Sequence, residues 1–222
     1  MATAAEQRER MVRRQLRGRG IVDERVLEAM GAVPRELFVP EPIRGRAYAD
    51  AALPIGRGQT ISQPWIVAAT CQALGLEGGE TVLEVGGGCG YSAAVLAALA
   101  ERVISIELIP ELAGAARTNL AQVGLGPPRV EVIEADGSLG YPSEAPYKAI
   151  ALHAAAPGAP RALLRQLAPT GRLVGPVAEG MDESLTLFSR DPRDPGRYRR
   201  RRIAPCRFVP LLGAEGYPAS SA

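Results

Sequence analysis

Short apolar runs alternate with helix-type patterns through the middle of the chain, and this alternation constrains the fold more than any other feature. The apolar runs lie at 81–85, 102–106, 130–133, 149–152 and 172–174, and helical patterns lie at 64–74, from 91, from 110 and at about 160–167. Strands separated by helices are typical of a mainly parallel sheet with helices on both faces. The sequence therefore predicts an α/β fold.

The segments on either side of this region have different patterns. Before it, we expect a helix over 5–18 and a second from Asp23, a typical capping residue, to Met30, followed by a loop-rich stretch that several prolines interrupt. After it, 184–189 and 202–212 resemble strands, and no helix fits between them. We therefore expect an antiparallel hairpin at the edge of the sheet.

Composition and charge argue against several classes of protein. The 26 basic and 24 acidic residues leave a net charge of +2, too small to indicate nucleic acid or a membrane surface by itself. Cys71, Cys89 and Cys206 are odd in number and widely spaced, which favours a reducing compartment over a disulfide framework. With one histidine, His153, and no zinc-type spacing, we expect no metal. No apolar run reaches the roughly 20 residues of a membrane span, and no signal stretch is recognised, so we expect a cytoplasmic protein.

A glycine cluster lies between a predicted strand and a predicted helix. Gly86, Gly88 and Gly90 follow the strand that contains Glu84. Glycine lets the backbone approach a ligand closely, and the first amides of a helix can face that ligand. Glu107 ends the next strand, 21 residues after Gly86, where nucleoside-binding folds place the acid that accepts the ribose hydroxyls. For the glycines alone, a purely structural tight turn is the alternative.

The glycine spacing and one further acid narrow the class of ligand. G-x-G-x-G is one residue shorter than the G-x-G-x-x-G loop that brings a pyrophosphate to helix amides. Asp136 and Gly137 follow the third strand at the same sheet edge, where they could hold an adenine amino group, with an ordinary turn aspartate as the alternative. We expect S-adenosylmethionine, a nucleoside ligand without phosphates. The residues 64–178 are then a cofactor-binding core, between an N-terminal extension at 1–63 and C-terminal strands at 179–222, in a single domain over 1–222.

Eleven blocks distributed along the chain carry a family resemblance. They lie at 15–23, 26–30, 33–36, 48–50, 53–56, 58–64, 93–96, 105–107, 136–138, 154–157 and 207–211. The most specific is Gln59-Thr-Ile-Ser-Gln-Pro64. With these blocks the sequence resembles the protein-L-isoaspartate (D-aspartate) O-methyltransferase family from about residue 8 to 217. It departs from the family at Cys89, where a serine is usual.

The resemblance implies a Rossmann-like methyltransferase sheet of variant strand order, with an antiparallel strand near its end. It also implies methyl transfer from S-adenosylmethionine to the α-carboxylate of L-isoaspartyl residues in damaged proteins or peptides, and leaves D-aspartyl residues open as a second substrate. The ester then collapses to a succinimide, which starts repair. The candidate residues are Ser62 for catalysis; Glu84, Gly86, Gly88, Gly90, Glu107, Asp136 and Gly137 for the cofactor; and Thr60, Ser62, Gln63 and Val209 for the substrate.

Methylation of a carboxylate needs little proton transfer. A carboxylic acid with a pKa near 4 is already ionised at pH 7, so no general base is required. The rate should depend on alignment of oxygen, methyl carbon and sulfur with water excluded. Ser62, two residues before the helix that begins at Pro64, is expected to orient the carboxylate by a hydrogen bond, and a simple helix cap is its structural alternative.

Other functions compete with this one. A related carboxyl methyltransferase could act on an aspartate of one dedicated peptide, and a chain with a degraded glycine loop could bind the cofactor without catalysis. A nucleic-acid methyltransferase is less favoured because the fourth strand is not followed by an Asn/Asp-Pro-Pro-aromatic motif. The expected partners are isoaspartyl proteins or peptides, without nucleic acid or membrane, and the expected state is a monomer. We expect Arg199–Arg202 to be a solvated hairpin and His153 to be a packed or pocket-rim residue.

Overall fold

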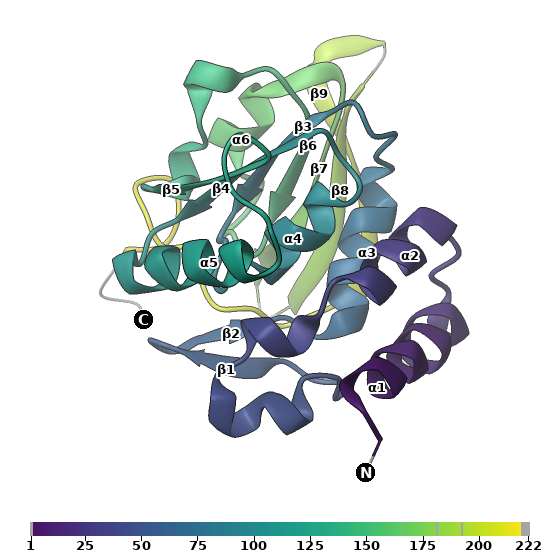
Figure 1. The fold of residues 1–222 in the computed structure, drawn as a ribbon. Coiled ribbons are helices and arrows are strands. Elements are labelled where there is room, and N and C mark those ends of the chain that lie inside the picture. Colours follow the sequence, from purple (N-terminus) through teal and green to yellow (C-terminus); the bar gives the residue numbers. More distant parts are fainter. Residues whose placement is uncertain (1, 181, 192, 219–222) are drawn as a thin grey trace.

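The computed structural model describes residues 2–180, 182–191 and 193–218. Within these residues, seven strands form one sheet in the order β5-β4-β3-β6-β7-β8-β9 (Figure 1). Their bounds are Thr81–Val85 (β3), Arg102–Glu107 (β4), Val130–Glu134 (β5), Tyr147–Leu152 (β6), Leu167–Glu179 (β7), Asp182–Asp191 (β8) and Asp194–Pro205 (β9). β5, β4, β3, β6 and β7 run parallel to one another, whereas β8 is antiparallel to β7 and β9 is antiparallel to β8. The predicted α/β sheet with antiparallel C-terminal strands is confirmed.

Helices cover both faces of the sheet, as the alternation predicts. α3 (Pro64–Leu74), α4 (Tyr91–Ala97) and α5 (Pro110–Gln122) share one buried cluster with Val82 of β3, whereas the short α6 (Arg161–Arg165) shares the other with Leu83. Successive residues of a strand point to opposite faces, so β3 must be apolar on both. This arrangement leaves the carboxyl ends of the parallel strands open at one edge.

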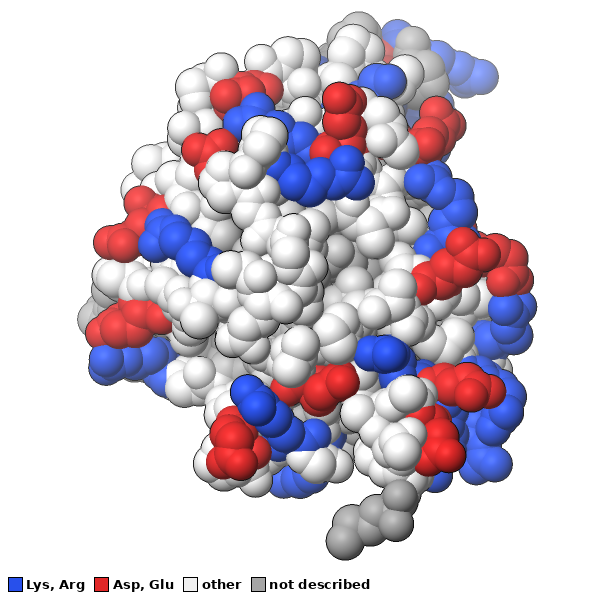
Figure 2. All heavy atoms as spheres, in the orientation of Figure 1, with Lys and Arg blue, Asp and Glu red and all other residues white. Residues whose placement is uncertain are grey.

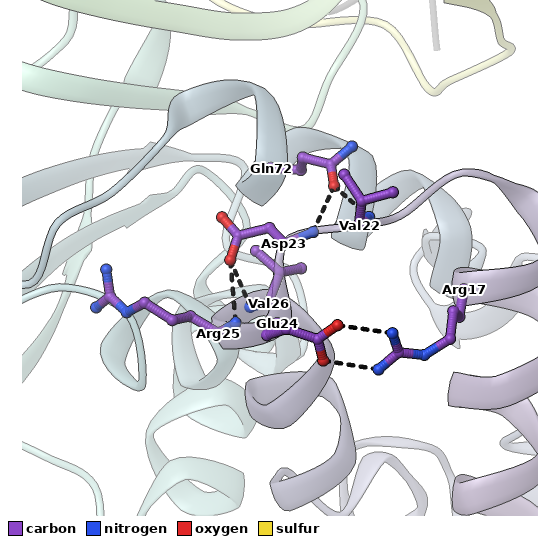
Figure 3. A network of polar contacts seen from close by, with 7 residues as sticks. All are labelled: Arg17, Val22, Asp23, Glu24, Arg25, Val26 and Gln72. Atoms are coloured by element: carbon purple, nitrogen blue, oxygen red, sulfur yellow. Dashed lines mark hydrogen bonds and ion pairs between the residues drawn. The ribbon is translucent and has the colours of Figure 1, made fainter.

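The N-terminal extension packs on α3. Its first part, up to residue 32, contains α1 (Ala4–Met11), a π-type turn at Val12–Leu16, a 3₁₀ turn at Arg17–Arg19 and α2 (Glu24–Ala32). Asp23 caps α2, as predicted, by accepting hydrogen bonds from the amides of Arg25 and Val26. The side-chain oxygen of Gln72 in α3 accepts from the amides of Val22 and Asp23 (Figure 3).

The buried cluster continues from this extension into the core. Met11, Leu16, Leu27 and Met30 belong to the same cluster as the α3 and α4 side chains. This continuity favours a single-domain organisation.

The stretch expected to be loop contains regular elements. Two 3₁₀ helices occupy Arg35–Phe38 and Glu41–Arg46, and a hairpin joins β1 (Leu53–Gly56) to β2 (Gln59–Ile61). At its tip Arg57 has a φ of 53°, between two glycines, and its guanidinium bonds Glu111 of α5 at 2.6 Å. The hairpin therefore reaches across to the helix layer.

The position predicted for the last strand was wrong. β9 spans Asp194–Pro205 rather than 202–212, because the arginine-rich segment lies in an edge strand, where alternate side chains reach water and nearby acids. Arg200 and Arg202 pair with Glu179, and Arg199 pairs with Asp191 at 3.0 Å. Residues 206–212 leave the sheet and return toward its open edge.

Acidic and basic side chains are interspersed on the face of the molecule shown in Figure 2. In Figure 2 the red and blue side chains alternate toward the rim of the face shown, and its middle is largely uncharged. Among the described residues, no helix is long and apolar enough to cross a bilayer.

Candidate active site

A pocket lies at the carboxyl edge of the parallel strands, where ligands bind in open α/β sheets. The loops after β3, β4, β5 and β6 contribute to its wall, and β2 and the segment 209–212 close it. The predicted site residues among its lining are Thr60, Ser62, Gly86, Gly88, Glu107, Gly137 and Val209. Ser62 and Glu107, 45 positions apart in the sequence, therefore face one shared cavity.

The glycine loop is built for close approach. Gly86 and Gly88 have φ angles of 84° and 55°, which L-residues rarely adopt. The amides of Gly86 and Gly87 donate to the carbonyl of Ile106, and the amide of Gly88 donates to Glu107. These three amides thus bond within the protein. The lining also includes Tyr91 and Ser92, in the first turn of α4, whose amides have no intrahelical partner.

Glu107 holds the loop and keeps capacity for a ligand. Its side chain accepts the amide of Gly88 at 2.7 Å and the amide of Ile109 at 2.9 Å, one on each oxygen. A carboxylate has about four acceptor positions, so roughly two remain. Glu107 is 6% exposed and lines the pocket, which suits an acceptor for paired ribose hydroxyls.

Three other predicted cofactor residues do not line this pocket. Gly90 lies beneath it, where a Cβ would come within 3.3 Å of Ala116 in α5. Glu84 is fully buried behind the loop and accepts a short hydrogen bond from Ser105. Asp136 turns away, although its neighbour Gly137 lines the wall with no space for a side chain, since a Cβ would lie 2.6 Å from Val85.

Asp136 anchors the C-terminal segment instead. One oxygen accepts the amide of Ser138 at 2.9 Å and the other accepts the amide of Ala214 at 2.7 Å. Ala155, just after β6, exchanges backbone hydrogen bonds of 2.8 Å with Val209 and Leu211. The segment 209–214 is therefore held near its beginning by Ala155 and at its end by Asp136, and it forms part of the pocket wall.

These contacts predict a pH-dependent contribution of Asp136 to stability. Burial pushes its pKa upward, but hydrogen bonds from Ser138 and Ala214 outweigh burial, and the pKa is lowered overall. Asp136→Asn should lower the free energy of unfolding in urea by about 1–2 kcal/mol at pH 7, because an amide group replaces one acceptor. A carboxyl group whose pKa is lower in the folded than in the unfolded protein stabilises the folded state at pH values above its unfolded pKa, near 4. This stabilisation is lost as the pH falls through the folded-state pKa.

The gap between wild type and Asp136→Asn should therefore shrink in urea titrations at progressively lower pH. Asp182→Asn, at an exposed position, serves as the matched control and should change little. A gap that stays constant into acid would contradict the assignment.

His153 lines the pocket and meets Glu84 beneath it. Its Nε2 lies 3.4 Å from Oε1 of Glu84, and its side chain is 7% exposed. Within the described residues, both ring nitrogens and that glutamate oxygen are buried without a hydrogen-bond partner. The ring is thus a packed residue of the pocket wall, close to the carboxylate that supports the loop.

Ser62 stands where the pocket meets a neighbouring one. Gln63 is the N-cap residue of α3, so Ser62 lies one position before the cap, and its hydroxyl has no hydrogen bond within the described residues. Ser62 therefore does not cap α3, and the helix-cap alternative is wrong. The second pocket is lined by Thr60, Ser62, Gln63 and Val209, together with residues 205–208. The predicted substrate residues thus gather around one junction.

Cys89 replaces a usual hydroxyl with a buried thiol. It lines the pocket, and burial raises its pKa to about 11, so it is a neutral thiol near pH 7.

Within the described residues, no cluster of three or more histidine, cysteine or acidic side chains could hold a metal ion.

S-adenosylmethionine fits this set of residues. Glu107 offers free acceptor positions for ribose, Gly137 and Gly88 leave the wall without side chains, and Ile106, Leu108 and Ile109 provide apolar surface for a base. Sheet, glycine loop and acid together define a methyltransferase that uses S-adenosylmethionine.

Comparisons with known proteins identify which methyltransferases it resembles. The sequence profile described as "Protein-L-isoaspartate(D-aspartate) O-methyltransferase (PCMT)" matches residues 6–216, and the chain belongs to this family. It is 54% identical over 212 residues to protein-L-isoaspartate O-methyltransferase 2 of Marinobacter nauticus, covering 95% of each chain. It is 50% identical to the protein-L-isoaspartate O-methyltransferase of Methanoregula boonei, covering 96% of each.

Two solved structures have the same fold. One, a protein-L-isoaspartate O-methyltransferase, has a TM-score of 0.80 at 28% identity over 94% of this chain and 66% of that chain. Another, from Plasmodium falciparum and in complex with S-adenosyl-L-homocysteine, has a TM-score of 0.79 at 23% identity, covering 92% of this chain and 98% of that chain. The predicted family resemblance is confirmed.

Proposed function

We propose that this chain transfers a methyl group from S-adenosylmethionine to the α-carboxylate of L-isoaspartyl residues in proteins and peptides, which begins repair through a succinimide. The observation that carries the proposal is the shared cavity of Ser62 and Glu107, with the serine hydroxyl free to donate. One residue suits the carboxylate and the other suits the ribose of the methyl donor. Family membership over residues 6–216 supports the same activity.

The residues have separate tasks in this reaction. S-adenosylmethionine supplies an electrophilic methyl carbon attached to a sulfonium. Glu107 binds ribose hydroxyls, and the turn at Gly86–Gly88 leaves room for the rest of the ligand. Ser62 donates a hydrogen bond to one carboxylate oxygen and leaves the other free to react, which limits stabilisation of the ground state. Thr60, Gln63 and Val209 position the peptide beside it.

Proteins in the cytoplasm are the proposed partners, and a monomer is the proposed active form. All the residues assigned above come from one chain. Arg199, Arg200 and Arg202 of β9 pair with Asp191 and Glu179, which lowers the positive charge that could attract nucleic acid and supports a protein substrate. Asp136, Glu84 and Gly90 act behind the pocket wall in this proposal.

Paired peptides that differ only in linkage test the function. In an isoaspartyl residue the free group is the α-carboxylate, whereas in an aspartyl residue it lies one carbon further along the side chain. We expect base-labile label from methyl-labelled S-adenosylmethionine on the isoaspartyl peptide, and kcat/KM at least about 100-fold lower on the aspartyl peptide.

The alternatives predict other outcomes. Equal labelling of both peptides would contradict isoaspartyl repair and favour a general carboxyl methyltransferase. Binding of S-adenosylhomocysteine in calorimetry without any labelling would favour a non-catalytic module.

A further inference from the structure

Arg35 is a buried cation without a carboxylate partner. It lies in the 3₁₀ helix after α2, its side chain is fully buried, and within the described residues no acidic group comes within ion-pair distance. Nε donates to the carbonyl of Ala47 at 2.7 Å and Nη2 donates to the carbonyl of Ser62 at 2.8 Å. Nη1 is buried without an acceptor. Buried charges are normally paired, so this one calls for an explanation.

The guanidinium lies directly behind the pocket. Its Cζ is 4.8 Å from the centre of the Tyr91 ring, and both Tyr91 and Ser62 line the pocket. Tyr91 is held in turn by the edge of Phe38, with ring centres 5.6 Å apart. Arg35 thus contacts two parts of the wall, Ser62 just after β2 and Tyr91 at the start of α4.

We propose that Arg35 is a positioning residue for the substrate carboxylate. Its bond to the Ser62 carbonyl fixes the segment that carries the donating hydroxyl, and its unpaired charge attracts the anion into the pocket. This inference rests on the proposed function, because the isoaspartyl carboxylate is the missing counter-charge.

Indirect attraction suits the chemistry better than a direct ion pair. A carboxylate held by an arginine fork would be stabilised before reaction, and that stabilisation would be lost as its charge is neutralised in the transition state. A guanidinium one layer behind the wall acts at longer range and leaves the oxygens free. In a buried setting its field is screened less than that of a surface arginine.

The test compares a charged ligand with a neutral one in the same pocket. The ligands are an isoaspartyl peptide and the same peptide with isoasparagine, whose amide replaces the carboxylate, each titrated onto the protein with S-adenosylhomocysteine present. Arg35→Met should weaken isoaspartyl binding roughly tenfold relative to wild type, as expected for a charge several ångströms away at an effective dielectric constant of about 20. Binding of the isoasparaginyl peptide should change less than about threefold, and Arg35→Lys should restore most of the difference.

Arg25→Met is the matched control. Arg25 also donates to two backbone carbonyls, those of Leu76 and Leu99, but does not line or back the pocket, so its loss should leave the charge preference unchanged. Equal weakening of both peptides by Arg35→Met, or no weakening of either, would overturn the proposal. If Arg35→Met fails to fold, Arg35→Lys provides the test. It keeps the positive charge, so loss of the preference for the charged peptide in Arg35→Lys would overturn the proposal.

The titration, together with the labelling assay on the paired peptides, separates this inference from the proposed function. If the wild-type protein neither binds nor methylates either peptide, the proposed function is wrong. If wild type methylates the isoaspartyl peptide, and Arg35→Met still prefers the charged peptide to the neutral one, only the role of Arg35 is wrong.

Discussion

Ser62→Ala is expected to lower kcat/KM on an isoaspartyl peptide by about 100-fold, the size typical when a reacting group loses its alignment by about 1 Å. The hydroxyl has no competing hydrogen bond within the described residues, so removing it takes away the orienting contact and little else. Folding should be unaffected, because Ser62 precedes the N-cap residue of α3 and does not cap it. Initial rates over a range of peptide concentrations measure the effect.

Two comparisons sharpen this result. Ser143→Ala, at an exposed serine away from the pocket, should keep wild-type kinetics. S-adenosylhomocysteine should bind Ser62→Ala as tightly as it binds wild type. Wild-type kcat/KM in Ser62→Ala would remove the serine from the mechanism.

Glu107→Gln should weaken binding of S-adenosylhomocysteine at least about 100-fold, which corresponds to roughly 3 kcal/mol. Two effects add. The ligand loses an ionised acceptor for its ribose hydroxyls, and the new NH₂ group must face the amide of Gly88 or of Ile109, so that two donors meet. Isothermal calorimetry measures the affinity without any need for turnover.

Glu134→Gln is the matched control for this experiment. Glu134 pairs with Glu107 in the register of β4 and β5 and also ends its strand, but it is exposed and outside the pocket. The affinity of Glu134→Gln for S-adenosylhomocysteine should stay within about twofold of that of wild type, as for most surface substitutions. Affinity lost equally in both variants would mean that the strand ends, rather than the Glu107 carboxylate, are responsible.

Local chemistry predicted the central sheet well. The apolar runs of β3 and β4 and the cap at Asp23 depend on neighbours within a few residues, and the structure has them where expected. The arginine-rich β9 was misplaced because an edge strand needs no apolar face, so periodicity gave no signal. The β1–β2 hairpin has only a short glycine-flanked tip and depends on α5 for its contact.

The site was predictable in part for the same reason. The acid after β4 could be found by spacing from Gly86, and it lines the pocket. Asp136 follows the same rule, yet one of its oxygens accepts from Ser138 and the other from Ala214, 78 residues further along, which spacing does not reveal. The sequence did not indicate that Arg35 is buried, since arginine side chains normally lie at the surface.

The segment 209–214 has a consequence for biosynthesis. Its backbone bonds to Ala155 and Asp136 complete a wall whose other parts begin as early as Ile55. A nascent polypeptide still short of that segment can form the parallel strands on the ribosome, but it has an open-sided, unfinished cleft. Methyl transfer therefore has to wait until the segment through residue 214 has been translated, and a ribosome stalled before this point should carry an inactive product.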